Sequence, residues 1–393
     1  MANVKHKSTN GRPIGVDLFA GVGGMSLGFE QAGFDVRAAV EFDPVNVCTH
    51  GKNFPNCKTI QDDLTALSGT TLMEKAGLRA GCVDVVFGGP PCQRFSLIGR
   101  RRIEDERNLL IFHFARLVRE IRPRYFVLEN VPGLLLGDAI ELFRSFRRRI
   151  RRAGYELVEP VRVLNAAEFG VPQRRQRAFL LGFMKGMEPP RYPESTTSND
   201  NHGRRLSPTV WDAIGDLPDI EEYPYLMSRD RYVGKLGRPS QYAKPLRAME
   251  SERDDVEPWK VLNGRGLGGC LRTKHSPEIE RRFADTTPGT SEKISRFFRL
   301  DCDGVAHTLR AGTGPDYGSH TAARPIHPKV PRCITTREAA RLHSFPDWFE
   351  FHPTKWHGFQ QVGNSVPPLL AEAVARSIVG LLANDTQSEK EKG

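Results

Sequence analysis

The sequence is poor in cysteine and lacks the closely spaced cysteine pairs that disulfide frameworks and zinc sites use. Its seven cysteines are scattered over 393 residues, and no two of them form a CxxC pair. An odd number with this spacing predicts reduced thiols in a cytosol, with neither a disulfide framework nor a zinc site.

The sequence also lacks internal repeats and apolar runs of membrane-spanning length. Its polar opening, MANVKHKSTNGRP, does not have the pattern of a signal peptide. Hydrophobic residues make up 39% of the chain and the mean hydropathy is -0.44, values typical of a soluble globular protein. The chain is long enough for a large core and for about two domains.

Acidic residues are fewer than basic residues. The chain has 57 lysines and arginines against 47 aspartates and glutamates, a formal net charge of +10, and its pI is near 9.3. This excess is compatible with binding to a polyanion such as a nucleic acid, although many basic proteins bind none.

What is present centres on residues 84–96, DVVFGGPPCQRFS. The apolar run is typical of a buried strand, and the glycines and prolines after it end the strand. Because prolines restrict the backbone, Cys92 is expected on a stiff turn at the carboxyl end of that strand, where ligands bind in α/β sheets. From this stretch alone, a reactive thiol and a buried structural cysteine are equally good interpretations.

Two features upstream are typical of a nucleotide-binding edge. A predicted strand at 14–19 leads into the glycine-rich turn 20–24 and a helix, which allows a ligand to approach the backbone closely. A second predicted strand, 36–40, ends at Glu41, which is placed to accept ribose hydroxyls. Tight packing of the turn and a solvated strand-end charge are the alternatives, and the GxGxxG pattern is incomplete because Ser26 takes its last position.

Another predicted strand, 125–128, ends in Glu129, which would face the same crevice as Cys92 in a shared parallel sheet. Residues 139–152 have the spacing of an amphipathic helix, with an apolar stripe on one side and six arginines on the other. We interpret the arginines as a solvated face that adds to the long-range field of the protein.

The arginine cluster QRRQR at 173–177 precedes a predicted strand at 178–183. It either clamps phosphate or a polar base edge, or forms an exposed basic turn. From about 186 to 332 proline, glycine and serine dominate without strand–helix alternation, so we expect a separate, irregular region. A capped helix is predicted to open at 336, and His343 in it is expected to be a packed structural residue.

In order, these motifs resemble those of the DNA (cytosine-5)-methyltransferases over nearly the whole chain. The motifs are DLFAGVGG at 17–24, Glu41, GGPPCQRFS at 88–96, ENVPG at 129–133, QRRQR at 173–177, REAARLHSFP at 337–346 and QVGNSVPP at 361–368. The resemblance implies an α/β fold, with a Rossmann-like S-adenosylmethionine-dependent catalytic domain and a smaller, irregular target-recognition domain. The implied boundaries are 1–186 for the catalytic domain, 187–355 for the target-recognition domain, 356–386 for a C-terminal helix returning to the catalytic domain, and 387–393 for a disordered tail.

The resemblance also implies the chemistry. Cys92 would add to C6 of a cytosine flipped out of the duplex, so that C5 accepts the methyl group. Glu129 would engage N3 and the amino edge of the base. Arg175 and Arg177 would hold the cytosine O2, the loop and nearby phosphate, with Arg177 as the favoured base contact.

The implied cofactor is S-adenosylmethionine, with no metal. Glu41 would bind its ribose and Asp63 its adenine amino group, in a pocket lined by Phe19, Ala20, Gly21, Val22, Gly23, Gly24, Glu41, Phe42, Asp63, Leu64, Pro91, Leu110, Asn364, Ser365 and Val366. Segment 100–107 would close over DNA, and the expected DNA contacts are Gln93, Ser96, Arg100, Arg310 and Arg324. Pro90 departs from the pattern, because many relatives have an aromatic residue there.

Two alternatives stay open at this point. A tRNA cytosine-5 methyltransferase would keep the same catalytic residues, and a nicotinamide-dependent oxidoreductase would share the early fold but would need neither Cys92 nor Glu129. The favoured interpretation is a monomeric enzyme of a bacterial or archaeal cytosol that methylates a short site in double-stranded DNA. It would belong to a restriction-modification system, with a cognate restriction endonuclease acting on the same site.

Overall fold

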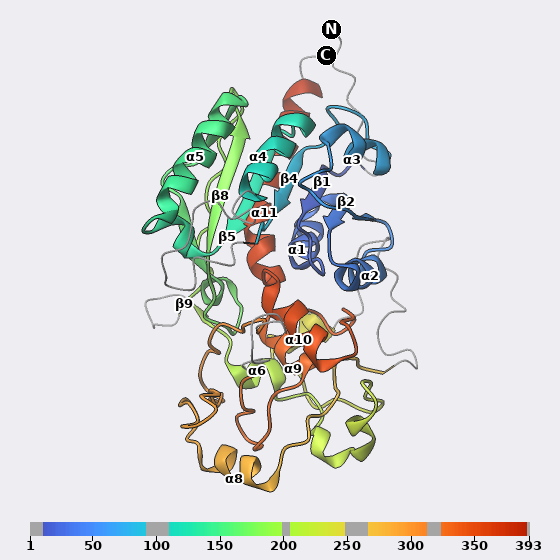
Figure 1. The fold of residues 1–393 in the computed structure, drawn as a ribbon, viewed down its shortest axis with the longest axis vertical. Helices are drawn as coiled ribbons and strands as arrows, with labels where there is room; N and C mark the ends of the chain where they lie inside the picture. Colours follow the sequence, from blue (N-terminus) through green and yellow to red (C-terminus); the bar gives the residue numbers. More distant parts are fainter. Residues whose placement is uncertain (1–10, 92–109, 199–204, 248–265, 313–323, 391–393) are drawn as a thin grey trace. The chain divides into compact units, whose positions relative to one another are not determined.

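The chain was analysed as a computed structural model that describes residues 11–91, 110–198, 205–247, 266–312 and 324–390, with side chains described up to residue 382. The backbone divides into two compact units (Figure 1). Unit 1 consists of Met1–Asn165, Gln176–Glu194 and Leu370–Gly393, and unit 2 of Ala166–Arg175 and Ser195–Leu369. The six cysteines within the described residues are free thiols, as the sequence predicted.

Unit 1 is built on an eight-stranded sheet. The strand order is β3-β2-β1-β4-β5-β8-β6, and β7 pairs with β8. Strands β1 to β5 are parallel, whereas β8 is antiparallel to β5, β6 and β7. The strands are β1 (Ile14–Leu18), β2 (Asp35–Glu41), β3 (Lys58–Gln61), β4 (Val85–Gly88), β5 (Tyr125–Asn130), β6 (Tyr155–Leu157), β7 (Arg162–Asn165) and β8 (Gln176–Met184).

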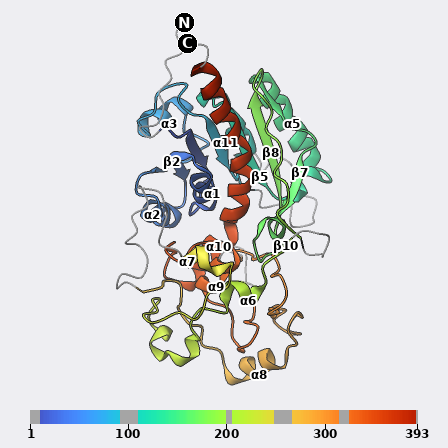
Figure 2. The ribbon, with the colours of Figure 1, turned by 180° about the vertical axis from the view of Figure 1, so that it is seen from behind.

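Helices cover both faces of this sheet. Helices α4 and α5 lie side by side on one face, and α1 and α11 cover the other (Figure 1, Figure 2). The helices of unit 1 are α1 (Gly24–Ala32), α2 (Pro44–Asn53), α3 (Gly69–Lys75), α4 (Leu110–Ile121), α5 (Ala139–Arg152) and most of α11 (Pro368–Lys390). Because the strand order reverses between β1 and β4, the carboxyl ends of these two strands form the switch point at which α/β sheets bind ligands.

The core of unit 1 is apolar and rich in phenylalanine. On one side of the sheet Phe87 stacks on Phe29 with ring centroids 3.7 Å apart. On the other side Phe126 makes edge contacts with Phe114 and Phe146, which come from α4 and α5. Each fully buried aromatic side chain contributes roughly 1.5 to 3 kcal/mol to folding, so these contacts fix the helices on the sheet.

The last helix departs from the sequence prediction. Disorder was expected from residue 387, but α11 continues to Lys390, since its final turns contain no proline or glycine to end it.

The sequence also suggested no segment of membrane-spanning length. The helical stretch Lys355–Leu382 does have that length and composition, but 56% of its most apolar 18-residue window is buried within the protein.

Unit 2 has short elements joined by long irregular segments, as expected from its composition. They are β9 (Thr197–Ser198), β10 (Arg205–Leu206), α6 (Val210–Ile214), α7 (Ala243–Arg247), α8 (Pro277–Asp285), α9 (Thr336–Leu342) and α10 (Lys355–Asn364). Helix α9 begins with a capping box between Thr335 and Glu338, the start that the sequence predicted within a residue.

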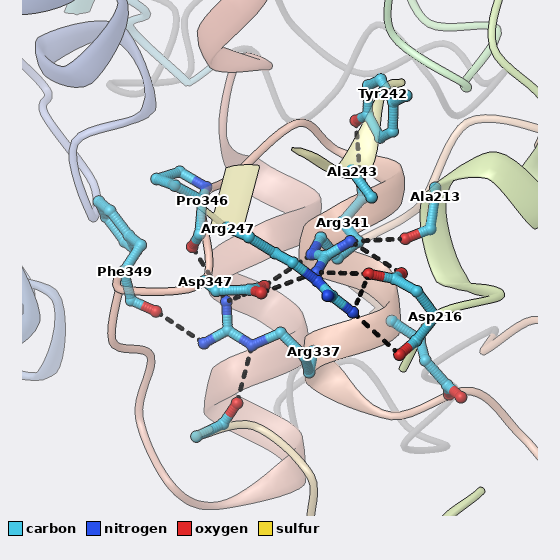
Figure 3. A network of polar contacts seen from close by, with 12 residues as sticks. Ala213, Asp216, Tyr242, Ala243, Arg247, Arg337, Arg341, Pro346, Asp347 and Phe349 are labelled. Carbon is cyan, nitrogen blue, oxygen red and sulfur yellow. Dashed lines mark hydrogen bonds and ion pairs between the residues drawn. The ribbon is translucent and has the colours of Figure 1, made fainter. Parts of the chain in front are cut away.

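Buried arginines hold these segments together (Figure 3). Arg341 is fully buried and bonds Asp347 in a bidentate pair at 2.6 and 2.7 Å, while its Nη1 lies 3.2 Å from Asp216. Arg337 donates to three backbone carbonyls, those of Gly268, Pro346 and Phe349, at 2.8 to 3.0 Å. Charge-assisted hydrogen bonds of this kind satisfy backbone groups that helices or strands satisfy elsewhere.

A second buried pair lies at the start of α9. Arg332 bonds both oxygens of Glu338 at 2.7 and 2.9 Å. Burial alone would raise the pKa of Glu338, but the charge and hydrogen bonds of Arg332, with the nearby His327 and the Thr335 N–H, lower it to about 2. Glu338 is therefore ionised at neutral pH and keeps α9 fixed to the segment before it.

Candidate functional site

The ends of β4 and β5 are joined by a side-chain bond. Asn130 donates from Nδ2 to the Pro90 carbonyl at 3.1 Å, which anchors the backbone just after β4. A Cβ added at Gly89 would lie 2.7 Å from Glu129 Oε2, so the glycine allows this carboxylate to lie against the turn. The prediction that the Cys92 turn and Glu129 follow neighbouring parallel strands is confirmed for the strands themselves.

Glu129 forms an ion pair with Arg177 at this edge. Arg177 Nε lies 2.8 Å from Glu129 Oε1, and the two side chains are 15% and 12% exposed respectively. Arg177 also donates from Nη1 to the Gln176 carbonyl at 2.8 Å. The pair brings an acid and a planar cationic donor together, near enough to solvent to meet a ligand and held in one geometry.

Four of the predicted residues, Cys92, Gln93, Ser96 and Arg100, lie outside the described residues, as does the predicted closing segment 100–107. Pro91, the last described residue before them, is exposed.

The predicted cofactor edge lies at the carboxyl ends of β1 and β2, in the same unit. Glu41 accepts the Gly21 N–H at 2.8 Å and the Asp43 N–H at 2.9 Å, so one carboxylate fixes the turns after both strands. Burial raises the pKa of Glu41, although these N–H donors oppose the rise. Phe19 takes a positive φ of 64°, a left-handed conformation that few residues other than glycine adopt.

The side chains at this edge suit an adenosine group that has no phosphate. The Phe42 ring is 70% exposed beside Glu41 and offers a free aromatic face. Asp63 is exposed with Oδ1 held by the Thr65 N–H, Leu64 is buried, and Leu110 is half-buried. None of the predicted pocket residues is basic, whereas a pyrophosphate would call for positive charge.

A buried polar chain below the glycine turn was not predicted. Ser26 donates to Asp17 Oδ2 at 2.6 Å and lies 3.2 Å from His50 Nε2, while His50 Nδ1 lies 2.8 Å from the Thr59 hydroxyl. Burial raises the pKa of Asp17 to about 8 and lowers that of His50 to about 3. Both are therefore neutral at pH 7. Gly23 packs against this chain and the Phe54 ring stacked on it, since a Cβ there would lie 3.0 Å from His50 Cδ2 and 2.2 Å from Phe54.

The three arginines of QRRQR have separate surroundings. Arg177 is on β8 and forms its ion pair with Glu129 on β5. Arg175 is 1% exposed within unit 2 and donates to the carbonyls of Leu309 and Gly363 at 3.0 and 2.8 Å. Arg174 is exposed and, with Arg205, lines a cavity of about 710 Å³ in unit 2. The proposed substrate contact of Arg175 remains a prediction, and its observed bonds are to backbone.

Gln173 and His343 join the predicted C-terminal motif to this cluster within unit 2. His343 is fully buried, as predicted for a structural histidine, with Nε2 2.9 Å from the Ser365 carbonyl and Nδ1 2.9 Å from Gln173 Nε2. Because a carbonyl only accepts, Nε2 bears the proton and Nδ1 accepts from the glutamine. Asn364 is exposed, whereas Ser365 and Val366 are buried.

Of the two predicted DNA contacts that the structure describes, Arg310 is exposed. Arg324 is half-buried, with its guanidinium 5.5 Å above the Phe359 ring. Only the first has the solvent access that a groove contact needs in this conformation.

Comparison with known proteins gives a consistent picture. Residues 15–380 match the family model described as C-5 cytosine-specific DNA methylase. The Type II methyltransferase M.XorII of Xanthomonas oryzae pv. oryzae is 49% identical over 380 residues, which are 97% of this chain and 88% of the relative. The Type II methyltransferase M1.HphI of Haemophilus parahaemolyticus is 34% identical over 375 residues, 94% of this chain and 87% of the relative.

Solved structures agree. A prophage-encoded protein from E. coli, described as a DNA modification methyltransferase, superposes with a TM-score of 0.77 at 34% identity, covering 94% of this chain and 99% of that one. The Dnmt2 methyltransferase of S. pombe superposes with a TM-score of 0.56 at 18% identity, covering 95% of this chain and 99% of that one, which shows a shared fold.

Proposed function

Because the chain belongs to the C-5 cytosine-specific DNA methylases and is a DNA (cytosine-5)-methyltransferase, we propose that it methylates one cytosine of a short duplex site through a covalent adduct of Cys92. The family uses S-adenosylmethionine, which supplies the methyl group when bound. The Cys92 thiolate adds to C6 of the flipped base, which makes C5 nucleophilic, and loss of the C5 proton and the thiolate restores the ring after methylation.

The observation that supports these roles is the Glu129–Arg177 pair beside the anchored end of β4. In the proposal Glu129 holds a proton at N3 of the cytosine, so that negative charge arriving in the ring is neutralised as the thiolate adds. Arg177 Nε lies 2.8 Å from Glu129, close enough for its other nitrogens to donate to the cytosine O2 while it orients the acid.

Arg175 has a different part in the proposal. Its guanidinium bonds the Gly363 carbonyl, and His343 bonds the Ser365 carbonyl, so both fix the backbone next to Asn364. We assign Arg175 as a positioning residue for that segment, which would form one wall of the cofactor pocket.

The cofactor pocket is proposed at the edge formed by β1 and β2. Glu41 would accept the ribose hydroxyls while it keeps its bonds to the glycine turn, Asp63 would accept the adenine amino group, and the exposed Phe42 ring would cover the base. The neutral, packed chain under the turn keeps the backbone of residues 21–24 in place for this contact.

Residues 187–355 are proposed to read the DNA site, and residues 100–107 to close over it. We further propose a monomer in a bacterial cytosol, partnered by a restriction endonuclease for the same site. The support for the bacterial cytosol and the endonuclease partner is the naming of M.XorII and M1.HphI as Type II methyltransferases of bacterial origin.

One experiment tests the activity and the specificity together. The protein is expressed in a host without DNA methylation, and the host DNA and tRNA are analysed by bisulfite sequencing. We expect unconverted cytosines at one recurring short DNA sequence. Fully converted DNA from cells that contain soluble, cofactor-binding protein would contradict the proposal, and unconverted cytosines in tRNA alone would replace it by an RNA activity.

A trapping experiment tests the nucleophile. Duplex DNA with 5-fluorocytosine at the target should form a stable covalent complex with the wild-type protein and S-adenosylmethionine, and none with Cys92→Ser. Cys48→Ser is the matched control, because Cys48 is an exposed free thiol on the same unit. A complex that persists in Cys92→Ser would identify another nucleophile.

A further inference from the structure

The outer face of α5 has a charge pattern that the catalytic site does not use. Six arginines and one glutamate on this 14-residue helix account for half of the formal net charge of +10 of the chain. Phe143, Phe146 and Ile150 point into the core, and the arginines are exposed except for the half-buried Arg147. Figure 1 shows α5 at the edge of unit 1, with α4 as its helical neighbour.

Only part of this charge is neutralised by the protein itself. Arg144 pairs with Glu141, and Arg147 pairs with Glu159 at 2.9 Å. Arg148 donates to the Ser145 hydroxyl, and Arg149 lies 4.4 Å above the Phe112 ring, contacts that leave both charges in place. Within the described residues, no carboxylate lies in ion-pair distance of Arg148, Arg149, Arg151 or Arg152.

The arrangement is unfavourable for an ordinary solvated helix. Arg144 and Arg148, Arg147 and Arg151, and Arg148 and Arg152 are like charges at i,i+4, and such pairs destabilise an isolated helix. Surface helices commonly alternate glutamate with lysine or arginine to avoid this. The helix dipole offsets part of the repulsion in the last turn but does not reach Arg144 and Arg148. The Arg148–Ser145 hydrogen bond and the Arg149–Phe112 ring contact leave this repulsion between charges in place, and a local cost of this kind points to a function.

We infer that this arginine face binds the phosphate backbone of duplex DNA outside the catalytic site. The inference rests on the proposed function, since DNA is then the polyanion that the protein meets. Guanidinium groups match phosphate oxygens in a bidentate manner, and α5 is about 21 Å long, a length over which a duplex presents about a dozen phosphates. In this proposal, contact here retains the enzyme on long DNA between successive target sites, and a duplex trimmed to one target site lacks the extra phosphates on which the contact depends.

The test compares two double variants that remove the same net charge. Arg148→Gln with Arg152→Gln removes two uncompensated charges, and Arg144→Gln with Arg147→Gln removes two that are already paired. Binding of non-cognate duplex DNA of plasmid length is measured against salt concentration. Each lost phosphate contact reduces the steepness of the plot of log affinity against log salt by about 0.9. The slope of the 148/152 variant should therefore be shallower by about 1.8, and this variant should bind roughly tenfold more weakly at low salt.

Two activity measurements complete the test. On a short duplex with one site, the 148/152 variant should keep the wild-type kcat/KM. On DNA with many sites it should transfer several-fold fewer methyl groups per encounter. The 144/147 variant should be close to wild type in both.

The inference is overturned if the 148/152 variant keeps the wild-type salt slope and affinity, which would leave the face to a partner other than DNA. It is also overturned if both variants lose affinity equally, which would indicate only a net-charge effect. Failure of the wild-type protein to methylate the short duplex would instead refute the proposed function, so the two failures are distinguishable.

Discussion

In unit 1 the sheet buries phenylalanines, and the pair Glu129–Arg177 stands at its edge with side chains 12% and 15% exposed. In unit 2 a comparable pair lies fully inside the protein, because the side chains of Arg341 and Asp347 are both 0% exposed. A charged pair at the rim of an apolar core can change for chemistry at little cost to the fold, whereas a fully buried ion pair strongly destabilises the fold when one member is lost.

The largest effect is expected for Glu129→Gln, which should reduce activity and leave the fold nearly unchanged. The amide keeps the shape but cannot hold the proton at N3, so we expect the rate of methyl transfer to fall roughly 10² to 10⁴-fold. The free energy of unfolding should change by only about 1 kcal/mol, because the amide oxygen can still accept a hydrogen bond from Arg177 at the rim of the core. Single-turnover methylation and urea unfolding measure the two effects.

The control for this variant is Glu156→Gln, an exposed glutamate on β6 of the same sheet. It should leave the rate at the wild-type value. A large loss of stability in Glu129→Gln would instead place Glu129 among the structural ions.

The reverse result is expected in unit 2. Arg341→Leu leaves Asp347 and Asp216 with less compensation in a buried site and should lower the free energy of unfolding by about 3 to 5 kcal/mol. Urea unfolding combined with limited proteolysis would locate the loss in unit 2.

A double variant tests whether the unpaired buried charge causes the loss of stability in Arg341→Leu. Arg341→Leu with Asp347→Leu removes both members of the bidentate pair, and Asp216 keeps its partner Arg247. Arg337 loses the Asp347 carboxylate 3.8 Å away but keeps its three bonds to backbone carbonyls. We expect this protein to be more stable than the single variant. Equal or lower stability would show that packing, and not the unpaired charge, is responsible.

The buried polar chain that contains Asp17 and His50 should have an intermediate, pH-dependent effect on the free energy of unfolding. The folded pKa of Asp17 is raised to about 8, so the folded protein holds a proton that the unfolded chain releases near pH 4, and this group lowers stability as pH rises towards 8. The folded pKa of His50 is lowered to about 3. The stability that the neutral imidazole contributes is therefore lost progressively as the pH falls below about 6.5, where the unfolded chain takes up the proton.

The two effects oppose each other between about pH 4 and 6.5, and above that only Asp17 acts. We therefore expect the free energy of unfolding to fall by about 1.4 kcal/mol per pH unit between pH 6.5 and 8. Asp17→Asn should flatten this slope, as measured by denaturant unfolding at several pH values. A slope that is the same in the variant would contradict the assignment.

The smallest effect is expected for an exposed pair. Arg376→Gln breaks the bond to Glu372 on α11, where the arginine is 62% exposed, and should change the free energy of unfolding by less than about 0.5 kcal/mol. A larger change, seen in the same urea titration, would mean that surface pairs matter more in this protein than burial suggests.

Local sequence predicted much of unit 1. Short apolar runs ended by glycine or proline located β1, β4 and β5, and the stripe of Phe143, Phe146 and Ile150 located α5 at its observed bounds. The antiparallel direction of β8 was not predicted, because an apolar run has no direction by itself. The bond from Asn130 to Pro90 was equally invisible, since it depends on which strands become neighbours.

Apart from the start of α9 and the structural role of His343, unit 2 was predictable only as an irregular region. Arginine is normally a surface residue, so a sequence gives no sign that Arg337 and Arg341 are buried. Their partners are carbonyls and carboxylates from distant segments, and these become visible only after folding. Arg175 shows the same limit, because its motif predicts a substrate contact while its bonds go to the backbone of Leu309 and Gly363.

The hydrogen bonds of His343 have a use in spectroscopy. Its Nε2 proton is enclosed between the ring and the Ser365 carbonyl, and its other nitrogen accepts from Gln173, so the imidazole is locked in one tautomer. Such a proton exchanges slowly with water and gives a separate nitrogen-15 resonance. That single signal would report, in solution and without any mutation, whether residues 173, 343 and 365 stay joined as DNA and cofactor bind.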